Sequence, residues 1–553
     1  MTSPNIKRLD AIIEALELPV NTGQGTFNER IGQFLATEFL TPEIRATVAL
    51  MACTGSYPTE AEVARLTPPL AVGSHEQALK ILAQMIRKAS RKSRAREPEI
   101  FSGTIIDVSR SSRALSITGI PRVAMSLSAE ADELGALSVV WEGGGPGIVT
   151  LNSHQDGWSM EPRVWAQSLH VRKWLLSLKG AFWKSMNRLA SLPQGHSFVR
   201  AIRTLVSPLA NVLFDRSGPQ TLLILADCHY VTPEVPRLGI VTRVLAWEKV
   251  NPRLRTTVVL HDLLPIIDSK HFAPDQSLEH IEFMRFIAAC STVIIPSPHL
   301  NEQVDAVRAL FDSPPQARTI FAPYGLSTHA ESALSSRSVT PGTVKQPTFI
   351  MIGSMDDRKN HALAFWALGL MGRGINGNIG IASTLHVVGA RRPTSENTRD
   401  ALAFARANNV TVIEHHNASD ALVQEIRSNC HATLYLSWSE GFGLPILESL
   451  AQGVPVIASD IPPHRAHLPY GGITLTPAGD PRALCDILTA MATTDPNLIQ
   501  RGDSINYRAL PANSRMWAQL VLEGETPNIA MVQDPTRVGH HTTGELRLPS
   551  AAQ

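Results

Sequence analysis

The sequence has few cysteines and almost no net charge, and each shortage argues against a class of protein. No two cysteines form a C-x-x-C pair, so the pattern predicts reduced core thiols rather than a disulfide framework, a zinc site or a redox pair. The five are Cys53, Cys228, Cys290, Cys430 and Cys485. With 50 lysines and arginines against 49 aspartates and glutamates, the chain has little charge to attract a polyanion over a distance. The sequence therefore predicts no nucleic-acid partner.

Long apolar runs are also lacking. No run approaches the roughly 18 residues of a membrane-spanning helix. The start of the chain, Met-Thr-Ser-Pro-Asn-Ile-Lys, has no apolar segment of the kind that a secretory signal peptide carries. We therefore expect a cytoplasmic protein. Its 553 residues, 44% of them apolar, are enough for more than two average domains with sizeable cores.

Residues 1–98 are predicted to form a helical accessory region. Thr41 opens one helix, and Thr59–Glu62 and Ser74–Gln77 have the pattern of capping boxes. A basic run closes the region. We interpret this run as a solvated helix end and linker, with a docking surface for acidic partners or lipid as the alternative.

Short β-branched strands alternate with helical periods through the rest of the chain, which predicts parallel sheets with helices on both faces. We place one doubly wound, Rossmann-like domain at residues 99–328 and a second at 346–522. A linker at 329–345 separates them, and a disordered tail follows at 523–553. The expected fold class is α/β, with a cleft between the two domains. The predicted strands are Gly103–Val108, Ala136–Val140, Thr221–Leu225, Thr256–Leu260 and Thr292–Ile295, then Thr348–Ile352, Thr384–Val388, Val410–Ile413, Thr433–Leu436 and Val454–Ile457.

Two carboxylates stand eight positions apart around a glycine-rich turn in the second domain. Glu440 follows a predicted strand, and Gly443, Leu444 and Pro445 lead into a short helix that carries Glu448. Ligands of open α/β sheets bind at the carboxyl ends of the strands, where the free N–H groups of a following helix attract an anion. Carboxylates also accept hydrogen bonds from vicinal hydroxyls. The pair predicts a nucleotide-sugar site holding a hexose and a ribose; the alternative is an amphipathic core helix with solvated acids.

This segment, with Gln452-Gly-Val-Pro-Val-Ile-Ala-Ser-Asp460 after it, resembles the donor signature of the retaining family 4 glycosyltransferases. The resemblance extends over about residues 103–520 and implies the GT-B fold of two Rossmann-like domains. It implies an E-x7-E pair at Glu440 and Glu448, in which Glu440 contacts the transferred sugar and Glu448 the donor's hydroxyls.

Arg358 and Lys359 lie in the loop that follows the first strand of the second domain. A diphosphate leaving group gathers negative charge as the glycosidic bond breaks, and cations in a water-poor cleft stabilise that charge. The segment Arg358-Lys359-Asn360-His361 resembles the phosphate element of the same family, although Ser354 stands where many members have an arginine. The alternative is a surface turn with a basic pair. No D-x-D motif occurs in a suitable context, so we expect neither a metal nor a cofactor.

His261 and Asp262 end a strand of the first domain and face the same cleft. With Leu-Leu-Pro265 they resemble the H-D-L-I-P element of a mannosyltransferase-like branch of the family. The resemblance implies that His261 contacts the donor sugar near the reacting carbon; a structural histidine is the alternative. We expect Asp262 either to orient the histidine or to cap the next turn.

Ser116–Val123 resembles the T-G-I-x-R-[VY] element of the same branch. Gly119 lets the backbone approach a ligand closely, and the helix that begins near Pro121 offers N–H groups to a phosphate or an acceptor. Glu142–Gly147 is richer in glycine, but it lacks the strand and helix context of a dinucleotide-binding loop. We interpret it as a glycine-rich turn.

Together these motifs predict a retaining, metal-independent hexosyltransferase. It would transfer a sugar from a nucleoside diphosphate to a glycan or lipid-linked acceptor in cell-surface polysaccharide synthesis, with GDP-mannose as the first choice of donor by resemblance. The alternatives are a nucleotide-sugar epimerase or phosphorylase on the same fold and a catalytically silent protein of glycan assembly. The candidate residues are His261 and Glu440 for catalysis, and Arg358, Lys359, Gly443, Leu444, Glu448 and Gly119 for donor binding.

One segment of the first domain suggests a membrane surface as a further partner. Val171–Leu189 places aromatic and aliphatic side chains at helical spacing with five cations among them. Such a helix can lie in an anionic membrane interface, which would hold the protein at the inner face of the plasma membrane beside a lipid-linked acceptor. The alternative is an ordinary crossover helix that packs on the sheet and turns its cations to water.

Overall fold

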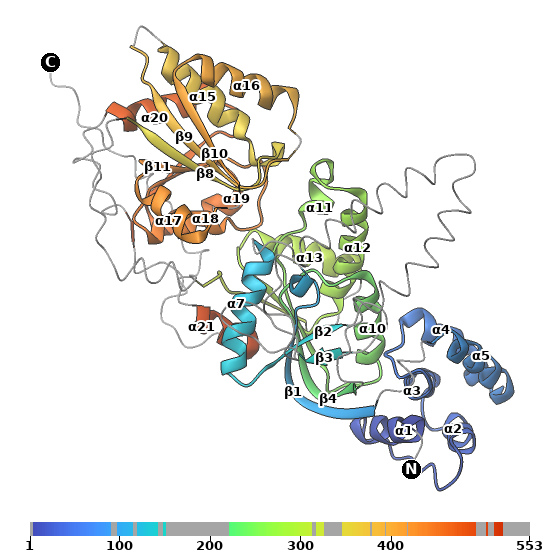
Figure 1. The fold of residues 1–553 in the computed structure, drawn as a ribbon. Coiled ribbons are helices and arrows are strands. Elements are labelled where there is room, and N and C mark those ends of the chain that lie inside the picture. Colours follow the sequence, from blue (N-terminus) through green and yellow to red (C-terminus); the bar gives the residue numbers. More distant parts are fainter. Residues whose placement is uncertain are drawn as a thin grey trace, which may run out of the picture.

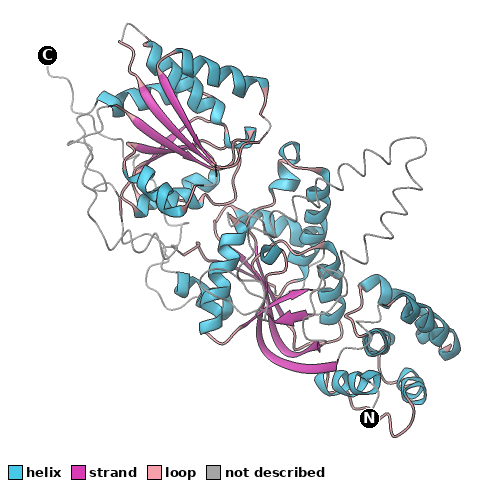
Figure 2. Ribbon diagram, viewed as in Figure 1, coloured by secondary structure: helices cyan, strands magenta, loops and turns pink. Residues whose placement is uncertain are grey.

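The computed structural model shows two β-sheets, each covered by helices on both sides (Figure 1, Figure 2). It describes residues 4–89, 97–113, 119–141, 148–150, 221–311, 317–325, 346–375, 379–392, 394–416, 418–493, 505–506 and 514–523. The strand orders are β3-β2-β1-β4-β5-β6-β7 and β10-β9-β8-β11-β12-β13. Both orders run outward in two directions from a central pair, β1 with β4 and β8 with β11, which is the doubly wound arrangement. The predicted α/β fold with two such domains is confirmed.

The first sheet is parallel except at one edge, where β3 runs antiparallel to β2. Its strands are β1 (Glu97–Asp107), β2 (Leu137–Trp141), β3 (Ile148–Thr150), β4 (Thr221–Thr232), β5 (Arg255–Val259), β6 (Thr292–Ile295) and β7 (Arg318–Phe321). The second sheet is parallel throughout. Its strands are β8 (Thr348–Ile352), β9 (Ser383–Val388), β10 (Val410–His415), β11 (Ala432–Tyr435), β12 (Val456–Ser459) and β13 (Ile473–Thr476). The sequence pattern missed the short strands β3, β7 and β13.

One of the two predicted capping boxes is present at the start of its helix. Thr59 caps its helix through the expected reciprocal pair of hydrogen bonds, whereas the Ser74 side chain makes no capping bond, so the second box is wrong. The first five helices are α1 (Pro4–Ala15), α2 (Phe27–Leu35), α3 (Pro42–Thr54), α4 (Glu60–Ala71) and α5 (His75–Lys88). The first domain adds α7 (Ile120–Glu133), α10 (Leu238–Glu248), α11 (Leu264–Ile267), α12 (Pro274–Ala289) and α13 (Leu300–Leu310). The second has α15 (His361–Arg373), α16 (Glu396–Ala407), α17 (Asp420–Ser428), α18 (Leu444–Ala451), α19 (Pro462–Arg465) and α20 (Pro481–Thr493), and α21 (Ser514–Glu523) comes last.

The helical region at the amino end shares its core with the first domain. β1 and β4 pair from Glu97 and Thr221 onward, while β5 joins β4 only from His229. The two central strands therefore project beyond the rest of the sheet, and α1 packs on both of them. The buried side chains of α1–α5 and of this projection form one continuous hydrophobic cluster. The helices are confirmed, but they extend the first domain and are not a separate accessory unit.

Side chains close the edge of β4 that β5 leaves open. The Tyr57 hydroxyl donates to the Leu223 carbonyl and accepts from the Leu225 N–H, at 2.9 Å in both cases. Trp247 Nε1 and Asn251 Nδ2 each donate to the Leu225 carbonyl at 2.9 Å. Buried backbone groups without partners would cost free energy, so these side chains take the place of a neighbouring strand.

Changing Tyr57 to phenylalanine is expected to destabilise the first domain. The ring stays, but one buried carbonyl and one buried N–H lose their partner, which costs about 2–4 kcal/mol of unfolding free energy. Urea unfolding followed by tryptophan fluorescence measures this, because Tyr57 contacts Trp141 and Trp247 edge to face. Tyr470→Phe is the control, since the hydroxyl of Tyr470 has no hydrogen bond within the described residues. Equal midpoints for the two variants would contradict the role of the hydroxyl.

The last described helix, α21, packs on α7 of the first domain (Figure 1). The Ser514 hydroxyl donates to Glu130 at 2.8 Å, and Trp517 Nε1 donates to the Ala322 carbonyl at 3.3 Å. The sequence assigned this helix to the second domain, and that assignment is wrong. An amphipathic pattern shows that a helix buries one face, but it does not say which sheet or helix covers that face.

Several predictions lie outside the described residues. They are the linker at 329–345, the tail beyond Glu523, the glycine-rich turn at 142–147, the membrane-surface helix at 171–189 and most of the basic run before β1. All five cysteines are buried and form no disulfide, as predicted. In the part of the chain that the structure describes, no helix combines the length and the apolar character needed to cross a membrane.

Candidate active site

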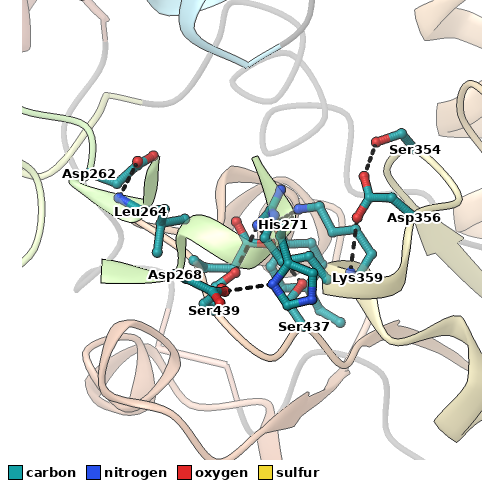
Figure 3. Close-up of polar contacts among 12 residues, drawn as sticks. Asp262, Leu264, Asp268, His271, Ser354, Asp356, Lys359, Ser437 and Ser439 are labelled. Atoms are coloured by element: carbon teal, nitrogen blue, oxygen red, sulfur yellow. Dashed lines mark hydrogen bonds and ion pairs between the residues drawn. The ribbon is translucent and has the colours of Figure 1, made fainter. Parts of the chain in front are cut away.

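Arg358, Lys359 and Glu440 lie in the loops at the carboxyl ends of β8 and β11, the central pair of the second sheet. The strand order reverses between these two strands, so their loops diverge and leave a crevice, which is where open α/β sheets bind ligands. The loop after β8 leads into the 3₁₀ turn Asp357–Lys359, and the loop after β11 leads to α18. Figure 3 shows Lys359 and Ser437 from these loops close to Asp268 and His271 of the first domain.

Glu440 is held by two cations inside this crevice. Its Oε1 forms an ion pair with Lys359 Nζ and lies 3.1 Å from Arg358 Nη1. The Ser437 hydroxyl donates to the same oxygen at 2.6 Å, and Lys359 Nζ also donates to the Tyr435 hydroxyl at 3.1 Å. The structure thus brings together a carboxylate and a basic pair that stand about 80 residues apart in the sequence.

The charges in this group persist despite burial. Burial opposes the ionisation of Glu440, but Lys359, Arg358 and the hydrogen bond from Ser437 outweigh it and lower its pKa to about 2. Burial also works against the charge on Lys359, yet Glu440 raises the pKa of Lys359 overall. Within this ion-paired group two cations face one carboxylate, while Asp356 and Asp262 also act on Arg358. The group can therefore give up one cation to an anionic ligand without leaving Glu440 unpaired.

Short polar side chains shape the loop that carries the cations. The Asp356 carboxylate accepts the Lys359 N–H at 3.2 Å, and the Ser354 hydroxyl donates to Asp356 at 2.6 Å (Figure 3). A Cβ atom at Gly353, where φ is +144°, would lie 3.3 Å from the side chain of Lys359. Ser354 therefore supports the turn and adds no charge. Arg358 and Lys359 are the cations that this loop supplies.

The ring of His261 points into the first domain. Nε2 donates to the Pro233 carbonyl at 2.6 Å, so Nδ1 is the acceptor and the Tyr324 hydroxyl donates to it. Burial lowers the pKa of His261 to about 4, although the bond to Pro233 acts in the opposite direction. The histidine is thus neutral and both ring nitrogens are occupied. The structure places His261 at the predicted strand end but does not bring its ring to Lys359 or Glu440.

The backbone of His261 is what meets the second domain. A Cβ atom on Gly441 would lie 2.2 Å from the His261 carbonyl oxygen and 2.9 Å from the Asp262 side chain, so only glycine fits this contact. Asp262 accepts the Leu264 N–H at 3.0 Å (Figure 3), which is the turn-capping role, one of the two that the sequence suggested. The Ser439 hydroxyl also donates to Asp268 across the cleft.

Gly441→Ala is expected to hold the two domains apart. The new methyl group overlaps the His261 carbonyl, and that backbone cannot yield without moving β5. Small-angle X-ray scattering should show a larger radius of gyration than for the wild type. Gly479→Ala is the matched control, because its added methyl would meet only Trp438, at an ordinary 3.5 Å. An unchanged scattering curve for folded Gly441→Ala would contradict the contact.

Glu448 is paired on both carboxylate oxygens. Oε1 lies 3.0 Å from Arg122 Nη1, and Oε2 lies 2.9 Å from Arg427 Nη2. Arg122 belongs to α7 of the first domain and also forms an ion pair with Asp420. Arg122 belongs to the T-G-I-x-R element of the sequence, but the sequence predicted no role for it. The structure shows it as an ionic link between the two domains.

The remaining predicted donor residues surround this link. Gly119 precedes α7 with φ +57°, and Gly443 precedes α18 with φ +97°, both in the conformational region that favours glycine. Leu444 and Glu448 line a small cavity of about 40 Å³ between α7, α18 and α21, together with Arg122. In the first turn of α18 Pro445 has no N–H and the Ile446 N–H donates to the Gly443 carbonyl at 2.9 Å, so Leu444 is the residue that can offer an N–H at this helix start.

Sequence reasoning also missed Tyr435 and Ser437, which contact Lys359 and Glu440 from β11 and its loop. Their position directly before Glu440 was the available signal. Among the described residues, no group of three or more histidine, cysteine, aspartate or glutamate side chains is arranged to hold a metal ion. Metal independence stays a prediction.

Comparison with known proteins supports the sequence resemblance over part of the chain. A model of the family described as "Family 4 Glycosyltransferase in conflict systems" matches residues 287–461. The chain is 30% identical over 141 residues to the serotype-specific mannosyltransferase WbdA of Escherichia coli, a match that covers 25% of this chain and 16% of the relative. The family 4 resemblance is thus confirmed over residues 287–461, which contain Arg358, Lys359, Glu440 and Glu448.

Two solved structures are similar at low identity. Alr3699/HepE of Anabaena, in complex with UDP and glucose, has a TM-score of 0.44 and 13% identity, covering 77% of this chain and 99% of that chain. The UDP-forming α,α-trehalose-phosphate synthase of Burkholderia xenovorans has a TM-score of 0.47 and 11% identity, covering 76% and 98%.

Proposed function

We propose that this protein is a retaining glycosyltransferase that moves a hexose from a nucleoside-diphosphate sugar to a hydroxyl group of an acceptor. The partly buried group of Arg358, Lys359 and Glu440 carries the proposal. Its two cations suit a diphosphate whose charge grows as the glycosidic bond breaks, and its ionised carboxylate suits sugar hydroxyls. The family match over the same residues supports this assignment.

The donor would occupy the crevice between the loops after β8 and β11. Its diphosphate would lie on Arg358, on Lys359 and on the Leu444 N–H, which is the first of α18 and follows Gly443. A diphosphate gives Lys359 a second anionic partner, so Glu440 becomes free to accept from a hydroxyl of the transferred sugar. Glu448 would accept from the ribose, a step that requires Arg122 to give up its place on that carboxylate.

Transfer with retention needs no nucleophile from the protein. The bond between the anomeric carbon and the diphosphate oxygen breaks, and its electron pair stays on the diphosphate. The acceptor oxygen then bonds to the same face of that carbon and gives its proton to the departing phosphate oxygen. This route agrees with a neutral His261 whose nitrogens are already occupied. Direct contact of His261 with the sugar stays a prediction, and it requires the ring to leave Tyr324 or Pro233.

GDP-mannose is the first candidate donor, on the resemblance at His261–Pro265 and the partial match to WbdA. Isothermal titration of the protein against UDP-, GDP-, dTDP- and ADP-sugars tests the proposal, followed by turnover with the sugar that binds. Absence of binding by every nucleotide sugar in a folded protein would overturn it. Conversion of the sugar without an acceptor would indicate an epimerase, and a requirement for inorganic phosphate would indicate a phosphorylase.

A glycan or lipid-linked glycan of cell-surface polysaccharide synthesis is the first candidate acceptor. The family description names conflict systems, which makes a macromolecule of a rival system a second candidate. Transfer of radiolabelled sugar in a cell lysate, separated into lipid, polysaccharide, protein and nucleic-acid fractions, distinguishes the two. Cytoplasmic location and contact with an anionic membrane surface stay predictions.

Arg122→Ala is expected to tighten donor binding by about fivefold, because the ribose no longer competes with a partly exposed ion pair on Glu448. Titration with the nucleotide sugar measures the change. Arg515→Ala is the matched control, since Arg515 pairs with Glu133 on the outside of the first domain. Weaker donor binding in Arg122→Ala would show instead that Arg122 helps to hold the donor.

A further inference from the structure

A second cavity lies at the amino ends of strands in the first sheet, whereas the cleft lies at their carboxyl ends. It has a volume of about 740 Å³, within the range of small-molecule sites, and it opens at the amino ends of β5, β6 and β7. Its apolar lining includes Leu245, Leu254, Ala288 and Phe311. Glu60 of α4 and Glu523 of α21 also line it, so the helical region and the last helix both reach the cavity.

The strand register places polar side chains together on one wall of this cavity. Arg255 is paired with His229 of β4, and Thr257 is in register with Thr292 and, through it, with Arg318. Residues two apart on a strand share a face, as do residues in register on parallel neighbours. All five side chains therefore project from the same face of the sheet, and all five line the cavity.

Two arginines on this wall are available for an anion. Four cations line the cavity, but Glu60 pairs with Lys249 at 2.7 Å and with Arg285 at 2.9 Å. Arg255 and Arg318 have no ion pair with any described residue. They begin strands two positions apart in the sheet, about 10 Å between strand axes, so their long side chains can meet on a single phosphate.

Hydrogen-bonding groups also line the cavity. Glu248, at the end of α10, accepts from the Thr256 hydroxyl at 2.9 Å, and burial raises its pKa to about 7. His229 Nε2 bonds the Thr257 hydroxyl at 2.7 Å, and burial together with Arg255 lowers the pKa of His229 to about 4, so this ring is neutral. The wall formed by Glu248, His229 and Thr257 thus suits hydroxyl groups rather than a second anion.

We propose that this cavity binds a phosphorylated sugar, separately from the nucleotide-sugar cleft. Arg255 and Arg318 would hold the phosphate at the sheet edge, and sugar hydroxyls would bond Glu248 and the Thr257 hydroxyl. The carbon face of the sugar ring would rest on Leu245 and Leu254. A ligand placed there touches the sheet, the helical region and α21 together, so it stabilises all three against unfolding.

Titration calorimetry of the full chain tests the site, with hexose 6-phosphate and hexose 1-phosphate as ligands and with free hexose, inorganic phosphate and GMP as comparisons. We expect a hexose phosphate to bind at about 1 mM or tighter and to raise the melting temperature, and free hexose not to bind. Arg255→Gln with Arg318→Gln should weaken binding at least tenfold. Arg373→Gln, an exposed change in the second domain, is the control.

Lys359→Met separates this cavity from the cleft. Binding of the hexose phosphate should persist in Lys359→Met and fail in the double arginine variant. Loss in Lys359→Met with retention in the arginine variant would place the ligand in the cleft and overturn the proposal. So would equal binding of inorganic phosphate, tighter binding of GMP, or no binding of any hexose phosphate up to about 10 mM. If the double variant does not fold, binding is measured with the single variant Arg318→Gln, because Arg318 is exposed at the start of β7.

Discussion

Replacing Glu440 with glutamine is expected to lower turnover by roughly ten- to a hundredfold, with a smaller effect on donor binding. Glutamine keeps the shape of the side chain but removes the charge that pairs with Lys359 and Arg358 and that accepts from the sugar hydroxyls. Initial rates at saturating donor measure the change. Glu425→Gln is the control, because Glu425 is an exposed acid of the same domain.

The pH dependence of the same variant gives a second readout. The pKa of Glu440 is lowered to about 2 from its usual value of about 4.5. Ionised Glu440 therefore stabilises the fold fully at pH values above about 4.5, and this stabilisation is lost as the pH falls toward 2. Activity between about pH 5 and 8 should therefore show no titration that Glu440→Gln removes. Wild-type rates in a folded Glu440→Gln protein would rule out the site.

Lys359→Met is expected to lower turnover by about 10²–10³-fold even with saturating donor, since it removes a buried cation from the leaving group. Methionine keeps most of the volume of the lysine side chain, so the substitution leaves little empty space in the crevice. EDTA should leave the wild type active, because the cations of the protein carry the leaving-group charge. Abolition of activity by EDTA and recovery with Mg²⁺ would show that a metal does this work instead.

The stability of the Lys359 variant needs its own control. Losing one partner of a buried ion pair leaves the other charge uncompensated, so Lys359→Met should melt lower than the wild type. The double variant Lys359→Met with Glu440→Gln removes both charges and should melt higher than Lys359→Met alone, while it stays inactive. Recovery of activity in the double variant would mean that the cation acts on folding and not on transfer. Lys80→Met, an exposed change on α5, is the surface control.

Sequence reasoning located the second sheet and the site on it because both depend on local patterns. The strand before Glu440, the glycine at Gly443 and the helix carrying Glu448 are adjacent in the chain, and so are Gly353 and the basic pair. The Lys359–Glu440 ion pair follows once β8 and β11 are neighbours, which their alternation with helices does not by itself establish. The sequence therefore predicted the separate segments of the site, and the order of the strands in the sheet determines which of them are in contact.

The failures have a different origin. Tyr57 replaces a missing strand along β4, and α21 packs on α7; both depend on contacts between distant segments that no local period encodes. Ser74 has the right residue types for a capping box, but its backbone, at φ −83° and ψ +72°, does not point the hydroxyl at the helix. Arg122 looks like an ordinary surface charge on a helix until a carboxylate of the other domain is placed opposite it.

The position of α21 on α7 bears on how the protein is made. The described part of the first domain ends at Gly325, yet the helix that covers α7 and bonds the Ala322 carbonyl is translated only at residues 514–523. Roughly 200 residues separate the two, so at common translation rates the first domain waits about 10–40 s on the ribosome with this apolar face uncovered. The amino-terminal domain can thus complete its fold only after nearly the whole chain has been translated. A nascent chain halted before α21 would expose this apolar face and would be a substrate for chaperones.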